Sequence, residues 1–264
     1  MRFRVLGYGP WAKVILNHIR KDGLVDAVLT KSIHSNSQWN NITSENLFLQ
    51  NSGNFNYFLC ANQQTNKLYL EKLLSLGAKS IWVEKPLNFE PIIFRNLIRN
   101  NKKIPVFINY THYFSNVVEE IDWNNISKLK FVWIKEFNEK DIVENLTCHD
   151  LAIVLKKLNI TVTNLHVQSV VRTQKGLTIR MKLNEIELSF DYVNSMSEKK
   201  KIVCVNGDKE YDFYKKLSVM SPLQSALNVF YSKLHYPFTL KEQADLSELY
   251  YKIKACETNS HFSP

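Results

Sequence analysis

The chain has 264 residues, of which 45% are hydrophobic and 22% charged, a composition typical of folded globular proteins and unlike that of disordered ones. It lacks a run of about 18 apolar residues and an N-terminal apolar stretch of the secretory type, so we expect a cytoplasmic protein without a membrane partner. The net charge of +9 favours anionic ligands, but the lysines are dispersed and no RNA-binding motif is present, so nucleic acid is not the expected partner.

Short strands alternate with helices over the first hundred residues. The β-rich runs lie at 2–6, 25–30, 56–60, 80–83 and 104–109, and helical spacings lie at 11–20, 66–76 and 91–101. Gly77 is expected to end the second helix, and Pro91 stands at the start of the third. This alternation is typical of βαβ units and predicts an α/β domain with a doubly wound parallel sheet of the Rossmann type.

In the second half of the chain, most of the predicted strands follow one another without helices between them. A strand is predicted at 129–137 and a helix at 149–158, followed by β-rich stretches at 163–173, 177–183, 185–192, 201–205 and 210–213, and by helices at 223–234 and 240–256. Turns at 175–176 and 206–208 join strands as hairpins do, which predicts an open, mostly antiparallel sheet in an α+β domain. We therefore place a dinucleotide-binding domain at 1–116 and a substrate and oligomerisation domain at 117–264, whose last helix can pack back on the first domain.

Scattered charged and sulfur-containing residues give little further signal. The four cysteines form no C-x-x-C pair, and the seven histidines show no ligand spacing, so neither a disulfide framework nor a metal site is predicted. The lysine cluster at 199–201 is expected to be a solvated face.

A glycine-rich turn follows the first strand, in the pattern G-x-G-x-x-A formed by Gly7, Gly9, Pro10, Trp11 and Ala12. The first glycine permits a tight turn, the second lets a pyrophosphate approach the backbone, and the alanine lets helix and strand pack closely. The free N–H groups of the following helix attract phosphate. The turn therefore predicts a dinucleotide site.

The end of the second strand indicates which dinucleotide binds. NAD sites usually carry a carboxylate here for the ribose 2′-hydroxyl, whereas this chain has Thr30, Lys31 and Ser32. Asp26 lies too early in the strand to serve. A cation and two hydroxyls suit a 2′-phosphate, so we predict NADP, with NAD as the alternative.

A tetrapeptide after the fourth strand, Glu84-Lys85-Pro86-Leu87, resembles the signature of the Gfo/Idh/MocA oxidoreductases. Residues 60–66 resemble the family's A-T-P-x-x-x-H loop, 109–114 the segment closing its cofactor domain, 145–149 its D-x-x-x-H motif, and 238–260 its terminal helix. The resemblance covers nearly the whole chain. It implies that Ala61, Asn62, Asn66, Glu84, Lys85 and Pro86 join the glycine-rich turn in binding the cofactor.

The resemblance also assigns the chemistry. It implies that Lys85 contacts the substrate oxygen and the nicotinamide ribose, and that His149, whose side chain suits proton transfer near neutral pH, is the acid/base. Asn145 stands where the family usually has aspartate, and it can hold a substrate hydroxyl without lending charge to the histidine. His112 and Tyr113 are expected to line the substrate cleft.

The implied activity is NAD(P)-dependent hydride transfer to or from a hydroxyl or carbonyl of a sugar, nucleotide sugar or related polyol. A homodimer or higher homo-oligomer through the second domain's sheet is also implied. Three alternatives stay open: a reductase of C=N or C=C bonds, a catalytically impaired regulator that still binds dinucleotide, and, on charge alone, a nucleic-acid binder.

Overall fold

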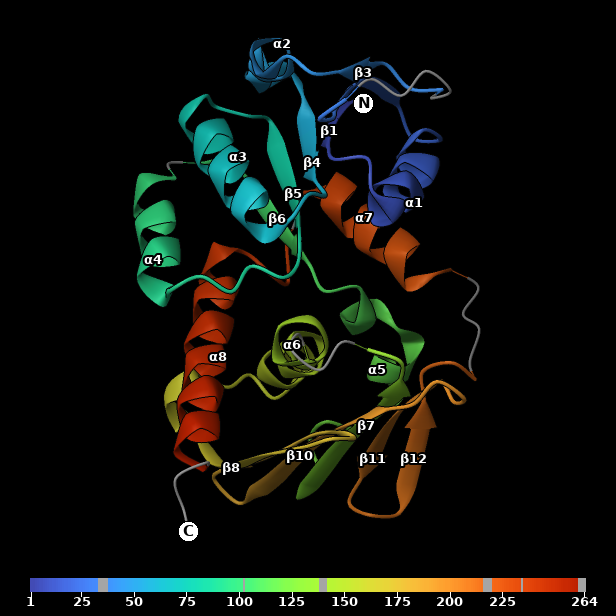
Figure 1. Cartoon of the computed structure of the whole chain (residues 1–264), viewed down its shortest axis with the longest axis vertical. Coiled ribbons are helices and arrows are strands. Elements are labelled where there is room, and N and C mark those ends of the chain that lie inside the picture. Colours follow the sequence, from blue (N-terminus) through green and yellow to red (C-terminus); the bar gives the residue numbers. More distant parts are fainter. Residues whose placement is uncertain (33–37, 102, 138–141, 216–219, 234, 261–264) are drawn as a thin grey trace. The chain divides into compact units, whose positions relative to one another are not determined.

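The computed structural model describes residues 1–32, 38–101, 103–137, 142–215, 220–233 and 235–260, and they form two compact units (Figure 1). The first unit comprises Met1–Asn109 and Leu227–Gln243, and the second comprises Tyr110–Ala226 and the chain from Ala244 onward. The sequence placed one boundary near residue 116. In the structure the division follows Asn109, and residues 227–243 return to the first unit.

A six-stranded parallel sheet forms the centre of the first unit, as predicted. Its strands are β1 (Arg2–Leu6), β2 (Leu24–Leu29), β3 (Asn41–Ile42), β4 (Asn56–Leu59), β5 (Ser80–Glu84) and β6 (Val106–Asn109). They stand in the order β3-β2-β1-β4-β5-β6. Because β1 pairs with both β2 and β4, the strand order reverses there, and ligands of such sheets bind beyond the carboxyl ends of the strands at that point.

Helices cover both faces of this sheet. They are α1 (Pro10–Ile19), α2 (Glu45–Leu49), α3 (Gln63–Ser75), α4 (Pro91–Asn100) and α7 (Pro222–Ser232). Figure 1 shows α3 and α4 on one face and α1 with α7 on the other. Coverage on both faces explains why β4 and β5 are buried along their whole length.

The returning segment supplies part of the first unit's aromatic core. Trp82 stacks on Phe107 with ring centroids 4.6 Å apart, and Phe230 packs edge-on at 5.2 Å from Phe58 and 5.5 Å from Trp82. The segment also bonds to the sheet, because the N–H of Ile108 donates to the carbonyl of Phe238 over 3.0 Å. Residues 227–243 are therefore an integral layer of this unit.

Local sequence signals account for most of the element boundaries. Gly77 has φ +73° and follows the end of α3, and the N–H of Ala78 bonds back to the carbonyl of Leu73, as predicted for a glycine-terminated helix. The helix begins three residues earlier than expected, because the side chain of Asn62 caps it by accepting from the N–H of Thr65 over 3.0 Å. The two-residue β3 and five-residue α2 were not predicted, since such short segments carry no periodicity.

The second unit is built on a mixed, mostly antiparallel sheet, as predicted. Its strands are β7 (Lys128–Lys135), β8 (Leu165–Thr173), β9 (Gly176–Leu183), β10 (Ile186–Asn194), β11 (Lys200–Val205) and β12 (Lys209–Asp212). The order is β12-β11-β7-β10-β9-β8, in which only the β7–β10 pair is parallel. Asn206 (φ 54°) and Gly207 (φ 85°) form the tight turn predicted between β11 and β12.

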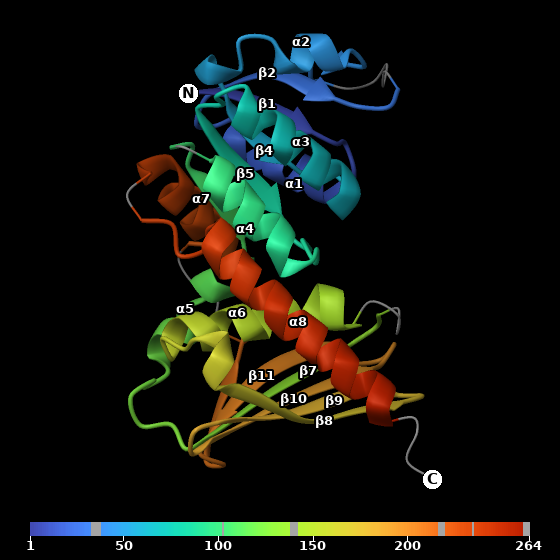
Figure 2. The same cartoon turned by 90° about the vertical axis from the view of Figure 1, so that its left-hand side faces the viewer.

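Helices of the second unit lie on one face of its sheet. Figure 2 shows α6 (Cys148–Lys157) and the later turns of α8 (Leu240–Ser260) over this face; a short helix, α5 (Asn116–Glu120), precedes the sheet. The helix expected to start at His149 is longer, because a π-helical turn at Val143–Thr147 precedes α6. In the part of the chain that the structure describes, no helix is long and apolar enough to cross a membrane.

Candidate functional site

The glycine-rich turn has the geometry that a pyrophosphate site requires. Gly7 has φ +98°, and a Cβ placed on it would lie 2.9 Å from the carbonyl oxygen of Cys60, so only glycine fits. A Cβ on Gly9 would meet no atom within 4 Å, so space is open beside the backbone where α1 begins. The first turn of α1 carries no acidic residue, and Ala12 is fully buried. The turn therefore fits the phosphates of a dinucleotide.

A cleft of about 520 Å³ opens beside this turn, at the carboxyl ends of β1, β2 and β4. Its lining is formed by Leu6, Gly7, Tyr8, Leu29, Thr30, Lys31, Ser32, Thr43, Glu45, Ala61, Asn62, Thr65 and Tyr69. Six residues predicted to bind the cofactor are thus brought to one cavity: Gly7, Thr30, Lys31, Ser32, Ala61 and Asn62. Thr43, Glu45 and Tyr69 were not predicted to line the cleft, since nothing in the sequence ties the 43–45 segment or the middle of α3 to the glycine-rich turn.

Charges of both signs border the cleft. Lys31 is exposed at its edge, and the hydroxyl of Thr30 donates to the carbonyl of Ser32, which shapes this loop. Glu45 also lines the cleft, but its carboxylate forms an ion pair with Lys72. Burial, together with the charge of Glu45 and a hydrogen bond to it, raises the pKa of the Tyr69 hydroxyl to about 12. The lining thus carries one cation, Lys31, and one carboxylate, which is paired with a lysine outside the lining.

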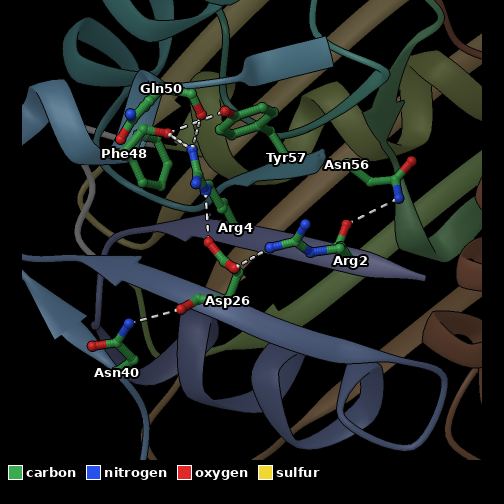
Figure 3. Close-up of polar contacts among 8 residues, drawn as sticks. All are labelled: Arg2, Arg4, Asp26, Asn40, Phe48, Gln50, Asn56 and Tyr57. Carbon is green, nitrogen blue, oxygen red and sulfur yellow. Dashed lines mark hydrogen bonds and ion pairs between the residues drawn. The ribbon is translucent and has the colours of Figure 1, made fainter. Parts of the chain in front are cut away.

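A buried arginine fastens the segment that carries Thr43 and Glu45 (Figure 3). Arg4, on β1, is 7% exposed and donates to the carbonyls of Phe48 (2.7 Å) and Gln50 (2.6 Å). It also donates to Asp26 over 3.0 Å, and Asp26 accepts a second bond from Arg2 over 2.7 Å. Asp26, excluded above as a ribose ligand, therefore anchors the sheet.

Two of the predicted cofactor residues have side chains committed to protein groups. Glu84, 5% exposed at the end of β5, accepts from the indole of Trp82 (2.7 Å) and the amide of Asn109 (3.0 Å). Burial raises the pKa of Glu84, and hydrogen bonds from Trp11, Trp82 and Asn109 oppose this rise. Asn66, 1% exposed, brackets Ala61 by bonding both its N–H (3.0 Å) and its carbonyl (3.1 Å). The structure gives Glu84 and Asn66 supporting roles at this edge of the sheet.

Lys85 directly follows β5 and is half-buried at the same edge, and its peptide bond to Pro86 is cis. Of the predicted turn residues, Pro10 starts α1 and Trp11 lies partly exposed in its first turn. Lys85, Pro10 and Trp11 thus lie in the unit that holds the cleft.

The second unit carries a separate cluster around His149. This histidine, in the first turn of α6, is 5% exposed. Its ring centroid lies 4.5 Å from that of His112, 6.0 Å from that of Tyr110 and 6.1 Å from that of Trp133. His112 in turn packs on Trp133 at 5.1 Å and on Phe213 at 6.0 Å. Two of the predicted substrate-cleft histidines are therefore neighbours within an aromatic wall.

The other two predicted residues of this unit are placed differently. Asn145 is half-buried in the π-helical turn before α6. Tyr113 directs its ring to Phe114 (5.3 Å) and lies under the ammonium of Lys157 (5.2 Å).

A buried ion pair stands next to the histidine cluster. Lys201, 1% exposed on β11, places its Nζ 2.7 Å from a carboxylate oxygen of Asp150, which is fully buried. The same ammonium lies 3.9 Å from the ring centroid of Trp133 and 4.8 Å from that of Phe213. Tyr192 donates to Asp150 over 3.1 Å. The expectation that the cluster at 199–201 is solvated is thus wrong for Lys201, because Asp150 and two aromatic rings compensate its burial.

The described residues contain no group of three or more histidine, cysteine or acidic side chains that could hold a metal ion.

No family model matches the chain. No curated protein matches it in sequence. Its fold, however, is close to that of several crystal structures. The WlbA (WbpB) dehydrogenase from Thermus thermophilus, in complex with NAD and alpha-ketoglutarate, is 13% identical with a TM-score of 0.78, over 96% of this chain and 94% of that one.

Two further structures extend the comparison. The UDP-N-acetylglucosamine 3-dehydrogenase GnnA from Acidithiobacillus ferrooxidans is 13% identical with a TM-score of 0.81, over 97% of each chain. The apo scyllo-inositol dehydrogenase from Lactobacillus casei is 10% identical with a TM-score of 0.76, over 98% of this chain and 96% of that one. At such identities the likeness establishes the fold, and it is the fold expected from the family resemblance.

Proposed function

We propose that this protein is a nicotinamide-dinucleotide-dependent oxidoreductase of the Gfo/Idh/MocA type. It would transfer a hydride to or from a hydroxyl or carbonyl carbon of a sugar, nucleotide sugar or related polyol. The observation that carries the proposal is the 520 Å³ cleft beside Gly7, at the strand-order reversal of a parallel sheet. The similar structures support it, since they include dehydrogenases for a nucleotide sugar and for an inositol.

The bound dinucleotide would supply a hydride acceptor or donor, and the chain's own residues would handle charge and protons. Lys85, a cation at the carboxyl edge of the parallel sheet, would stabilise the substrate oxygen as negative charge develops on it. His149 would remove or return the hydroxyl proton, and Asn145 would hold a substrate hydroxyl. These roles rest on the family resemblance.

We propose NADP as the preferred cofactor. The exposed Lys31 and the hydroxyls of Thr30 and Ser32 border the cleft, and the carboxylate of Glu45 is paired with Lys72. The ammonium of Lys31 and the two hydroxyls suit a 2′-phosphate. Two similar structures hold NAD, so NADH is the comparison that any measurement requires.

A reductase of C=N or C=C bonds is the second candidate. The neutral Asn145 favours it, because reduction needs a proton donor and no charged partner for the histidine. Once cofactor binding is established, oxidation assays with polyols and reduction assays with imines and enones distinguish the two. We also propose that copies of the chain associate through the sheet of the second unit, which light scattering on a sizing column tests.

The deciding experiment is fluorescence titration of the purified protein with NADPH and NADH. The same titration is repeated on Lys31→Asp, on Lys85→Ala and on Lys21→Asp, an equal charge change at an exposed residue outside the cleft lining. We expect NADPH to bind more tightly than NADH, and Lys31→Asp to weaken NADPH by about tenfold or more, since it exchanges an attraction for a repulsion. Lys21→Asp should change neither affinity. If neither nucleotide binds, the proposed function is wrong, and if Lys31→Asp leaves the preference unchanged, the NADP assignment is wrong.

A further inference from the structure

A buried acid/base needs a route by which its proton reaches water. His149 is 5% exposed, with Tyr110 and Trp133 packed near its ring. After each oxidation the histidine would hold the proton taken from the substrate, and it must lose that proton before the next cycle. Water has little access to the ring itself, so a neighbouring side chain is the natural carrier.

The neighbouring imidazole has the required position. The rings of His112 and His149 lie with centroids 4.5 Å apart and planes at 81°, so the edge of one ring is directed at the other. His112 is more exposed than His149, and it comes from the 3₁₀ turn at Thr111–Phe114, outside α6. We propose that His112 accepts the proton from His149 and passes it to solvent, acting as the proton exit of the site.

The step is a simple proton transfer. An N–H bond of the His149 imidazolium breaks, an N–H bond forms on His112, and the other nitrogen of His112 releases its proton to water. No electrons are exchanged, and both rings end neutral. This role rests on the proposed function, in which His149 takes the substrate proton, and it assigns to His112 a task distinct from lining the substrate cleft.

A compensated charge lies beside the pair. The ammonium of Lys201 lies against Trp133 and Phe213, the same rings on which His112 packs, and it forms an ion pair with the buried carboxylate of Asp150. Burial, followed by the charge of Asp150, raises the pKa of Tyr192 well above its usual value, and burial raises the pKa of Tyr214, so both phenols stay protonated. Tyr110 also faces the cluster, on the His149 side.

Aromatic rings pack around the pair. Trp133 contacts both histidines, whereas Phe213 contacts His112.

The test measures exchange of the His149 ring N–H with water by ¹⁵N-edited NMR on histidine-labelled protein, which requires no substrate. The resonance is assigned by its loss in His149→Gln. The probe variants are His112→Phe, which fills the site without a nitrogen, and His112→Gln, which keeps a polar chain but cannot titrate. His166→Asn, at an exposed position on β8, is the matched control.

We expect exchange at His149 to slow by at least about tenfold in His112→Phe and to be unchanged in His166→Asn. If His112→Phe fails to fold, the same slowing in His112→Gln decides the question. Unchanged or faster exchange in the folded variant overturns the proposal.

The outcome is separable from that of the proposed function, because NADPH titration of the same samples reports on the first unit alone. Normal NADPH binding with unchanged exchange rejects only the role of His112. Slowed exchange in a protein that binds neither nucleotide supports proton passage but rejects the oxidoreductase assignment.

Discussion

Replacing Arg4 by methionine tests whether the buried arginine holds the segment that borders the cleft. The substitution keeps most of the side-chain volume but removes the bonds to Asp26, Phe48 and Gln50. A hydrogen bond that involves a charged group contributes about 1.5–3 kcal/mol. Two of the three acceptors keep other donors, since Tyr57 still bonds the carbonyl of Phe48 (3.1 Å) and Arg2 still bonds Asp26. We therefore expect a loss of about 3 kcal/mol in the free energy of unfolding, below the full sum of three bonds.

Arg2→Met is the matched control for this measurement. Arg2 binds the same carboxylate, but its side chain is 52% exposed, so its removal should cost no more than about 1 kcal/mol. Urea denaturation followed by circular dichroism gives both values, and a loss of about 3 kcal/mol corresponds to a fall in Tm of roughly 6–12 °C. Because Arg4 also fixes the segment that carries Glu45, Arg4→Met should weaken NADPH binding when the folded protein is titrated. Equal losses in the two variants would refute the reasoning, since burial would then have no influence on the strength of these bonds.

Three further predictions follow from the described contacts. Gly7→Ala should lower the free energy of unfolding by about 2–4 kcal/mol, because it combines positive φ with a backbone clash. Gly9→Ala should leave stability unchanged and weaken only dinucleotide binding. Thermal melts with and without NADPH would report both effects. Lys201→Met should lower the free energy of unfolding by about 3–5 kcal/mol, because the Asp150 carboxylate is left buried without its cation. In a double-mutant cycle, adding Asp150→Leu should recover part of that loss. A double variant no more stable than the single variant would contradict this account. Burial alone would raise the pKa of Asp26, but hydrogen bonds from Arg2 and Arg4 lower this pKa. The contribution of Asp26 to stability is therefore present above the usual pKa of 3.8 and is lost as the pH falls further. The difference in free energy of unfolding between the native protein and Asp26→Asn should shrink on acidification from pH 5 to pH 2.

The parallel sheet was predictable because its signals are local. Strands buried on both faces read as short apolar runs, and the turn at Gly7 needs residue types that few other structures require. The family-like tetrapeptide at Glu84 falls where β5 ends, at the same edge as the cleft. These elements could be predicted because the residues that determine each of them are close in the sequence as well as in space.

The surroundings of the candidate residues were much less predictable. Trp133 lies on β7 and Phe213 directly follows β12, far apart in the chain, and nothing in either segment indicates that both pack on His112. Lys201 was misjudged because lysine is rarely buried, although its alternation with Val203 along β11 places it on the covered face. The partner that compensates such a charge is visible only once the sheet and α6 are assembled.

The return of residues 227–243 to the first unit has a consequence for how the protein is made. Phe230 packs on Phe58 and Trp82, so the parallel sheet cannot complete its core until residues 227–243 have been synthesised. Until then, the nascent first unit exposes an aromatic face, while the entire second sheet is being synthesised between its two parts. Domains usually fold in the order of their synthesis, but the first unit of this protein can complete its core only after most of the second unit has been made.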